Sequence, residues 1–143
     1  MDPRQLTPDL AVSPQISPDD VPAIAAAGFR TLINNRPDSE IGADENDAVM
    51  RQAAAAAGLD YHYLPFEPGA ITPDLIAGFA DATTGRKPAF AYCRSGTRCT
   101  VLWGLSQAGR RPLDEIMDIA SRAGYDLTNV QPLIQSLASR KGA

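Results

Sequence analysis

The chain has 143 residues, of which 44% are hydrophobic and 21% charged, a composition that suits one globular domain with its own core. The formal net charge of −4 argues against the broad basic surface that nucleic-acid binding requires, but it leaves room for a local cationic pocket. No stretch approaches the roughly 20 consecutive apolar residues that cross a bilayer, so we expect no membrane partner.

The sequence contains two cysteines, Cys93 and Cys99, and one histidine, His62. It shows no secretory pattern, so we expect a cytoplasmic, reducing location and no structural disulfide. Two cysteines and one histidine are too few for a standard zinc site, and we expect neither a metal nor a cofactor. The sequence does not indicate an oligomeric state.

Helical and extended segments alternate along the chain. Ser17 before Pro18 and Thr72 before Pro73 are typical helix starts, because a hydroxyl caps the first turn and proline fits the first helical position. The predicted helices lie within residues 18–27, 44–59, 71–85, 98–108, 112–124 and 128–140, the last beginning near Val130. The predicted strands are residues 29–35, 60–66 and 88–92, and we interpret the second of these as an interior strand.

This alternation predicts a single α/β domain over residues 1–143, with a mostly parallel sheet flanked by helices. In such sheets, ligands bind beyond the carboxyl ends of the strands. Cys93 directly follows the last predicted strand, so it stands where a functional site is expected.

The stretch Cys93-Arg-Ser-Gly-Thr-Arg98 joins that strand to a helix. Backbone N–H groups at such a junction bind anions, and Gly96 lets the backbone approach a ligand closely. Ser95 and Thr97 add hydroxyl donors, and the planar fork of Arg98 suits two oxygens of one anion. The same features lower the pKa of a cysteine, which favours a nucleophilic thiolate. The alternative is that Cys93 is a small buried hydrophobic residue.

The stretch "AYCRSGTR", together with "TLINNRPDSE" upstream, resembles the bacterial beta-lactamase-hydrolase-like protein phosphatase-like family, whose members are similar in fold to dual-specificity and tyrosine phosphatases. The resemblance extends from the first predicted strand through the helix after Cys93. It implies a phosphate-binding loop over Cys93 to Arg98, formed by Arg94, Ser95, Gly96 and Thr97 between them. It also implies that Cys93 is the nucleophile and Arg98 the anion clamp for a small phosphate ester.

Two features differ from the tyrosine phosphatase pattern. Tyr92 replaces the histidine before the cysteine, and four residues rather than five separate Cys93 from Arg98. The run "YCRSG" resembles the active loop of rhodaneses, which carry sulfane sulfur as a cysteine persulfide. A shorter ring of N–H groups suits a terminal sulfur atom better than a phosphate. The alternatives to a phosphatase are therefore a rhodanese-type sulfurtransferase and a non-catalytic anion-binding module.

A phosphatase of this kind needs a general acid for the departing alkoxide. Glu67, on the loop after the second predicted strand, is one candidate. Asp38, which follows the first predicted strand, is the other. Each has an ordinary alternative role, Glu67 as a solvated loop residue and Asp38 as a turn residue bonded to its own backbone. A sulfurtransferase needs no acid.

Other residues near the two motifs are expected to support the site. Arg36 either lines the anion pocket or holds Asp38 and Glu40, and we favour the second role. Arg94 either steers anions or is an ordinary surface residue. Cys99 stands where the phosphatase motif has a hydroxyl, so it packs in the helix, donates a weak hydrogen bond to Cys93, or forms a disulfide with it. Thr100 can supply the missing hydroxyl, and His62 is interpreted as structural or surface-exposed.

Overall fold

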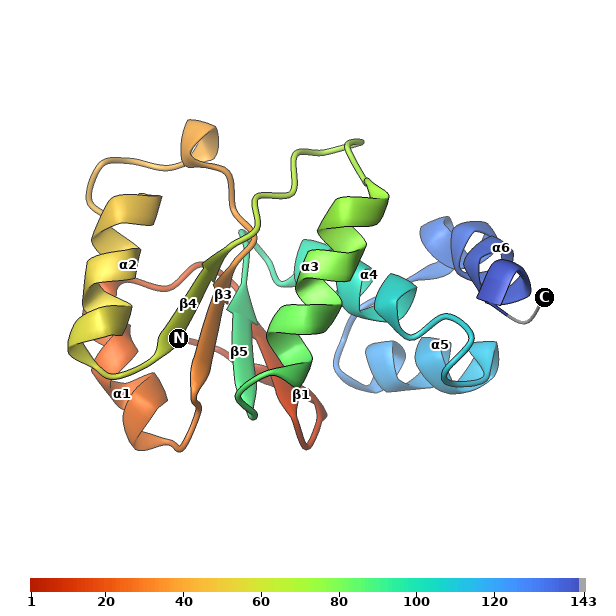
Figure 1. Cartoon of the computed structure of the whole chain (residues 1–143), viewed down its shortest axis with the longest axis horizontal. Coiled ribbons are helices and arrows are strands. Elements are labelled where there is room, and N and C mark those ends of the chain that lie inside the picture. Colours follow the sequence, from red (N-terminus) through yellow and green to blue (C-terminus); the bar gives the residue numbers. More distant parts are fainter. Residues whose placement is uncertain (142–143) are drawn as a thin grey trace.

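The computed structural model describes residues 1–141, which form one five-stranded sheet with helices on both faces (Figure 1). The strands are β1 (Arg4–Thr7), β2 (Leu10–Ser13), β3 (Thr31–Asn34), β4 (Asp60–Tyr63) and β5 (Ala89–Tyr92). Their order in the sheet is β1-β2-β5-β3-β4, and only the β1–β2 pair is antiparallel. The predicted α/β class with a mostly parallel sheet is confirmed. The predicted domain, residues 1–143, ends two residues outside the described part.

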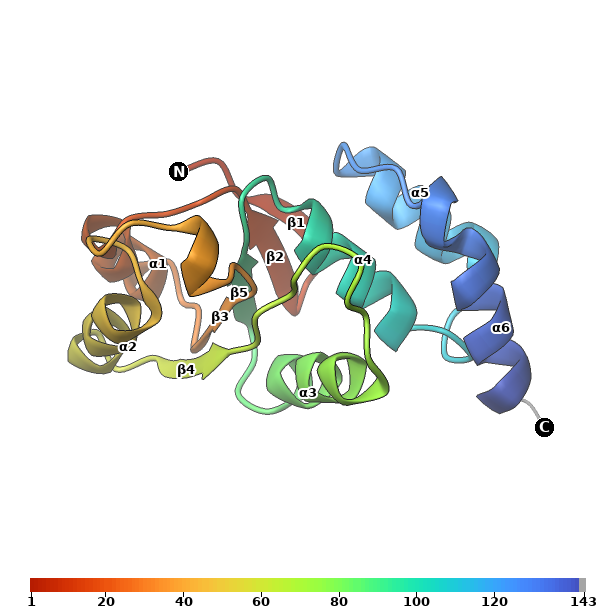
Figure 2. The same ribbon diagram turned by 90° about the horizontal axis from the view of Figure 1, so that it is seen from above.

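The helices form layers on either side of the sheet. α1 (Val21–Ala26) and α2 (Asp47–Ala56) cover one face, and α3 (Pro73–Thr84) and α4 (Thr97–Ser106) cover the other (Figure 1). α5 (Leu113–Arg122) and α6 (Gln131–Lys141) pack against α4 on its outer side (Figure 2). Short 3₁₀ turns lie at Pro18–Asp20, Asp38–Glu40 and Thr128–Val130. None of the helices within residues 1–141 is long and apolar enough to cross a membrane.

Each face of the sheet has its own hydrophobic core because strand side chains alternate between the faces. Along β5, Phe90 and Tyr92 join the core under α1 and α2, whereas Ala91 and Cys93 join the core under α3 and α4. The Tyr92 side chain therefore lies on the face of the sheet opposite Cys93.

Three details of the predicted elements need correction. The β1–β2 hairpin was not predicted, because four-residue strands are too short to show a period of two. β4 is an edge strand rather than an interior one, and its side chains are only partly buried or exposed. Residues 18–27 form a 3₁₀ turn followed by α1 rather than one helix, because Pro22 has no N–H to continue the ladder. Thr72 caps α3 as expected, with its Oγ1 accepting from the Leu75 N–H at 3.1 Å.

The four parallel strands end at the same edge of the sheet, so the loops that follow them meet there. The loop after β2 contributes Gln15, the loop after β3 contributes Arg36 and Glu40, the loop after β4 contributes Phe66, and the loop after β5 begins at Cys93. Strand order brings these loops together, since β5 lies between β2 and β3.

The α5–α6 layer should stabilise the domain through its buried side chains. We expect Ile134→Ala to lower the free energy of unfolding by about 2–5 kcal/mol, because this side chain is 1% exposed and its removal leaves a cavity. Its neighbour Leu133 is 36% exposed, and Leu133→Ala should change stability by only about 0.5 kcal/mol. Urea unfolding of both variants measures the difference, and equal losses would contradict this packing.

Candidate active site

The loop from Cys93 to Arg98 turns sharply at Gly96, directly before α4. Gly96 has φ +91°, a left-handed conformation that favours glycine. Any Cβ at this position would also overlap the hydroxyl of Tyr125, which donates a hydrogen bond to the Ser95 carbonyl at 3.0 Å. Tyr125, which follows α5, thus supports the loop from outside, a role that no sequence motif indicated.

The Cys93 sulfur is positioned to carry a negative charge. The Gly96 N–H donates to its Sγ at 3.1 Å. The pKa of Cys93 is lowered to about 6, first by a hydrogen bond from the Cys99 thiol and further by backbone N–H groups of the loop, while burial opposes the shift. A lowered pKa favours the thiolate form of Cys93, which argues against its being merely a packed hydrophobic residue.

Cys99 and Thr100 both lie in the first turns of α4 and are fully buried. Burial raises the pKa of Cys99, and the neighbouring Cys93 raises it further, which favours the protonated thiol. The Thr100 hydroxyl donates to the Gly96 carbonyl at 2.8 Å and fixes the turn. Cys99 is thus a packed helix residue, and its donation of a hydrogen bond to Cys93 stays a prediction.

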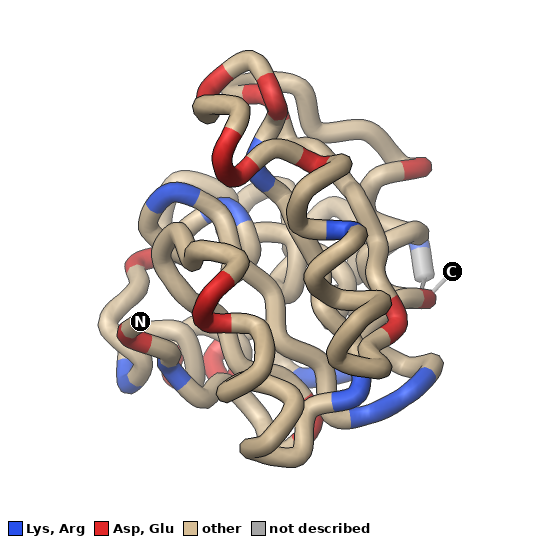
Figure 3. Tube along the Cα trace, turned by 90° about the vertical axis from the view of Figure 1, so that its left-hand side faces the viewer, with Lys and Arg blue, Asp and Glu red and all other residues tan. Residues whose placement is uncertain are grey.

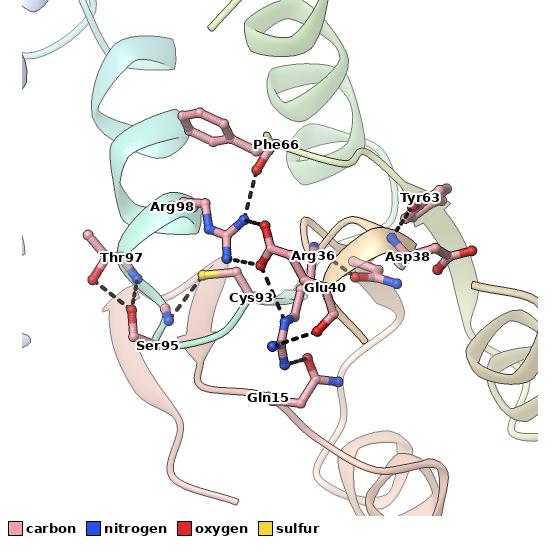
Figure 4. A network of polar contacts seen from close by, with 12 residues as sticks. Gln15, Arg36, Asp38, Glu40, Tyr63, Phe66, Cys93, Ser95, Thr97 and Arg98 are labelled. Carbon is pink, nitrogen blue, oxygen red and sulfur yellow. Dashed lines mark hydrogen bonds and ion pairs between the residues drawn. The ribbon is translucent and has the colours of Figure 1, made fainter. Parts of the chain in front are cut away.

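Arg98 is held by the carboxylate of Glu40, a contact that no sequence motif indicated. Its Nη1 and Nη2 donate to the two oxygens of Glu40 at 2.9 and 2.7 Å, and Nη1 also donates to the Phe66 carbonyl at 2.9 Å (Figure 4). The hydrogen bonds from Arg98 hold the pKa of Glu40 below its usual range. Glu40 lies 58 residues away in sequence, so only the position of "RPDSE" after a parallel strand hinted at this contact.

These bonds leave one edge of the Arg98 guanidinium available. Both Nη1 hydrogens and one Nη2 hydrogen are used, so among the described residues Nε–H and the second Nη2–H have no acceptor. These two donors point in the same direction and match two oxygens of one anion. Figure 4 shows this edge turned toward the Cys93 sulfur.

Arg36 braces Glu40 from the other side. Its Nη2 donates to the Glu40 carbonyl at 3.0 Å, its Nε lies 3.5 Å from a Glu40 carboxylate oxygen, and its Nη1 donates to Gln15 at 3.1 Å. Arg36 therefore holds Glu40, as expected, but its side chain makes no hydrogen bond or ion pair with Asp38 in residues 1–141. Arg36 also lines the cavity described next, and its contact with an anion there stays a prediction.

A cavity of about 810 Å³ opens above the loop. It is lined by Arg36, Glu40, Phe66, Pro68, Gly69, Arg94, Thr97, Arg98 and Asn129. Cys93 is fully buried beneath these residues. The Ser95 hydroxyl donates a hydrogen bond to the Thr97 hydroxyl at 2.9 Å. A second, apolar cavity of about 420 Å³ between α3, α4 and α6 contains none of the predicted site residues.

Neither predicted general acid lines this cavity. The Asp38 carboxylate accepts the Asp47 N–H at 2.8 Å at the start of α2, and Figure 4 shows it on the side of Glu40 away from Cys93. Glu67 is exposed on the loop after β4. Acidic residues gather along the upper edge of the molecule in Figure 3, where the carboxyl ends of the strands lie. His62 is exposed on the edge strand β4, which β3 separates from β5.

A cysteine with a lowered pKa and an arginine lie together at the carboxyl ends of the strands of an α/β sheet, where ligand sites occur. Residues 2–110 match the family described as beta-lactamase hydrolase-like protein, phosphatase-like domain. The family match shows that the domain is phosphatase-like. The chain belongs to this family, as its resemblance implied.

Individual relatives agree with this assignment. A beta-lactamase hydrolase-like protein from Agrobacterium fabrum is 36% identical over 121 residues, which is 82% of this chain and 28% of the relative. The chain therefore spans little more than a quarter of such relatives. A candidate phosphatase from Neisseria meningitidis is 34% identical, with a TM-score of 0.81 over 94% of this chain and 96% of its own. Tk-PTP, a tyrosine-phosphatase-like structure, shares the fold at 14% identity, with a TM-score of 0.77 over 99% and 97% of the two chains.

The Cys93 thiolate should form well below the ordinary thiol range. A rise in the ultraviolet absorbance of the thiolate should have its midpoint near pH 6, where a free cysteine would ionise at about 8.5. Because the proton is lost more easily in the folded site, the thiolate persists above pH 6 and disappears as the pH falls below it.

The Cys99 thiol can be tested as the source of this shift. Cys99→Ala removes the donor and should move the midpoint to higher pH, whereas Cys99→Ser keeps a donor and should leave it low. Identical midpoints for the two variants would show that Cys99 does not stabilise the thiolate.

Proposed function

We propose that this chain is a cysteine-dependent phosphatase-like hydrolase that acts on a small phosphate ester. The observation that carries the proposal is the available edge of Arg98, which faces a thiolate with a lowered pKa. Membership of a phosphatase-like family supports it, and so does the cationic lining of the cavity by Arg36, Arg94 and Arg98.

In this mechanism, the substrate phosphoryl group enters from the cavity and is bound by Nε–H and Nη2–H of Arg98 and by loop amides. Because Cys93 is buried in the folded chain, the loop has to open enough to admit the anion while Arg98 stays paired with Glu40. The Cys93 thiolate then attacks phosphorus, and a cysteinyl-phosphate forms as the ester oxygen leaves. Water hydrolyses this intermediate and regenerates the thiolate.

Sulfur transfer is a second candidate, favoured by one observation. Only four residues separate Cys93 from Arg98, so the ring of loop N–H groups is short and suits a terminal sulfur atom. In this alternative the thiolate attacks the sulfane sulfur of a donor such as thiosulfate, and sulfite leaves with the bonding electrons. The family assignment favours the phosphatase. A non-catalytic anion-binding module would keep its function in Cys93→Ser.

Intact mass separates these candidates directly. After brief exposure to an aryl phosphate, wild-type chain quenched in acid should gain the mass of one phosphoryl group, and Cys93→Ser should gain none. A parallel sample treated with thiosulfate tests for a persulfide. A transferable gain of one sulfur on wild type alone, with no phosphoryl adduct, would replace the phosphatase with the sulfurtransferase.

Arg98 should be irreplaceable by lysine. A lysine at this position keeps the charge but cannot hold Glu40 and an anion at the same time. We expect Arg98→Lys to lower kcat/KM for an aryl phosphate by about 10²–10³. The matched control is Arg122→Lys on the exposed side of α5, where the arginine side chain is 80% exposed. Comparable activity of Arg98→Lys and the control would contradict the proposed clamp.

A further inference from the structure

The carboxylate that lines the cavity above the loop is ionised, so it cannot act as a proton donor. Glu40 is the one carboxylate among the described residues that line it. Both of its oxygens accept from Arg98, at 2.9 and 2.7 Å, and Arg36 contacts it from the other side. An ionised carboxylate in this setting is a hydrogen-bond acceptor, and protonating it would break the contacts that position Arg98.

Three of the four hydroxyl groups around the loop donate within the protein, and the fourth, that of Thr97, accepts from Ser95. A threonine hydroxyl is too weak an acid to protonate a leaving oxygen. Ser95 donates to Thr97 at 2.9 Å, Thr100 donates to the Gly96 carbonyl at 2.8 Å, and Tyr125 donates to the Ser95 carbonyl at 3.0 Å. These protons hold the shape of the loop. Burial, moreover, raises the pKa of Tyr125, so its hydroxyl is a poor acid.

The two carboxylates predicted as general acids do not line the cavity. Asp38 accepts the Asp47 N–H at 2.8 Å and so satisfies one of the unpaired donors at the start of α2. Glu67 is exposed and follows Phe66, whose carbonyl is fixed by Arg98 at 2.9 Å. Phe66 and Pro68 line the cavity, but the intervening Glu67 does not.

The cavity wall contains cations where an acid would be needed. Arg36, Arg94 and Arg98 all line it. A guanidinium stabilises an oxyanion as it forms but does not protonate it, because arginine keeps its protons in proteins. An oxygen that leaves toward this cavity is therefore released as an anion.

We propose that the site acts on phosphoryl donors whose leaving group departs as a stable anion, namely aryl phosphates, acyl phosphates and phosphoanhydrides, and not on alkyl phosphates such as phosphoserine. This inference rests on the proposed phosphatase function. In the first step, the bond between Cys93 Sγ and phosphorus forms while the bond from phosphorus to the leaving oxygen breaks. The leaving oxygen takes the bonding electrons and no proton. Water then displaces the thiolate, and both of its protons end on inorganic phosphate.

The test is a series of ring-substituted phenyl phosphates whose phenols have pKa values from about 5 to about 10, followed by an alkyl phosphate. Phosphate release gives kcat/KM, which reports the steps through formation of the cysteinyl-phosphate. Without a proton donor, kcat/KM should fall by about tenfold for each unit of phenol pKa, and the alkyl phosphate should not be cleaved above background.

Two substitutions serve as controls in the same series. Asp38→Asn and Glu67→Gln should keep kcat/KM for the poorest aryl leaving group within about twofold of wild type, because neither carboxylate reaches the cavity. A general acid removed by either change would instead lower that rate by about 10²–10⁴ while sparing the most activated ester.

The outcomes distinguish the proposed leaving-group preference from the phosphatase function on which it rests. A steep dependence with inactive Cys93→Ser supports both. A shallow dependence, or a selective loss in either carboxylate variant, overturns the leaving-group inference while the Cys93-dependent phosphatase remains. If wild type neither releases phosphate from the most activated ester nor forms a phosphoryl adduct, both are wrong.

Discussion

The bidentate ion pair between Arg98 and Glu40 connects loops that the chain itself keeps far apart. Arg98 lies in the first turn of α4 after β5, whereas Glu40 follows β3, and the Phe66 carbonyl adds the loop after β4. The Arg98 and Glu40 side chains are only 17% and 25% exposed, so water screens this pair less than an ordinary surface pair. The pair fixes the guanidinium plane and leaves its second edge for an anion.

The same ion pair affects which groups stabilise a negative charge on the Cys93 sulfur. Glu40 partly neutralises Arg98, so the thiolate depends more on short-range donors, namely the Cys99 thiol and the loop N–H groups. Arg36 and Arg94 line the same cavity, so three arginines and one carboxylate meet there within a chain of net charge −4.

Some of this arrangement followed directly from local sequence. Cys93 had to stand at a strand end, because an apolar run stops there and Gly96 opens the turn into a helix. The cap at Thr72 also follows from rules that involve only neighbouring residues. The β1–β2 hairpin did not follow, because each strand has four residues and only pairing in the sheet defines them. Asp38 was a reasonable acid by position, but its carboxylate is used by the N-terminus of α2.

The sequence by itself determined the fold class, the family and the loop that carries Cys93, since each depends on contiguous residues. The tertiary structure decided which groups surround that loop. Glu40 meets Arg98 across 58 positions, and Tyr125 meets Ser95 across 30. These contacts exist because β5 is inserted between β2 and β3, so that neighbours in the sheet are distant in the chain. No local pattern encodes that order; the joint burial of two cores on the faces of one twisted sheet does.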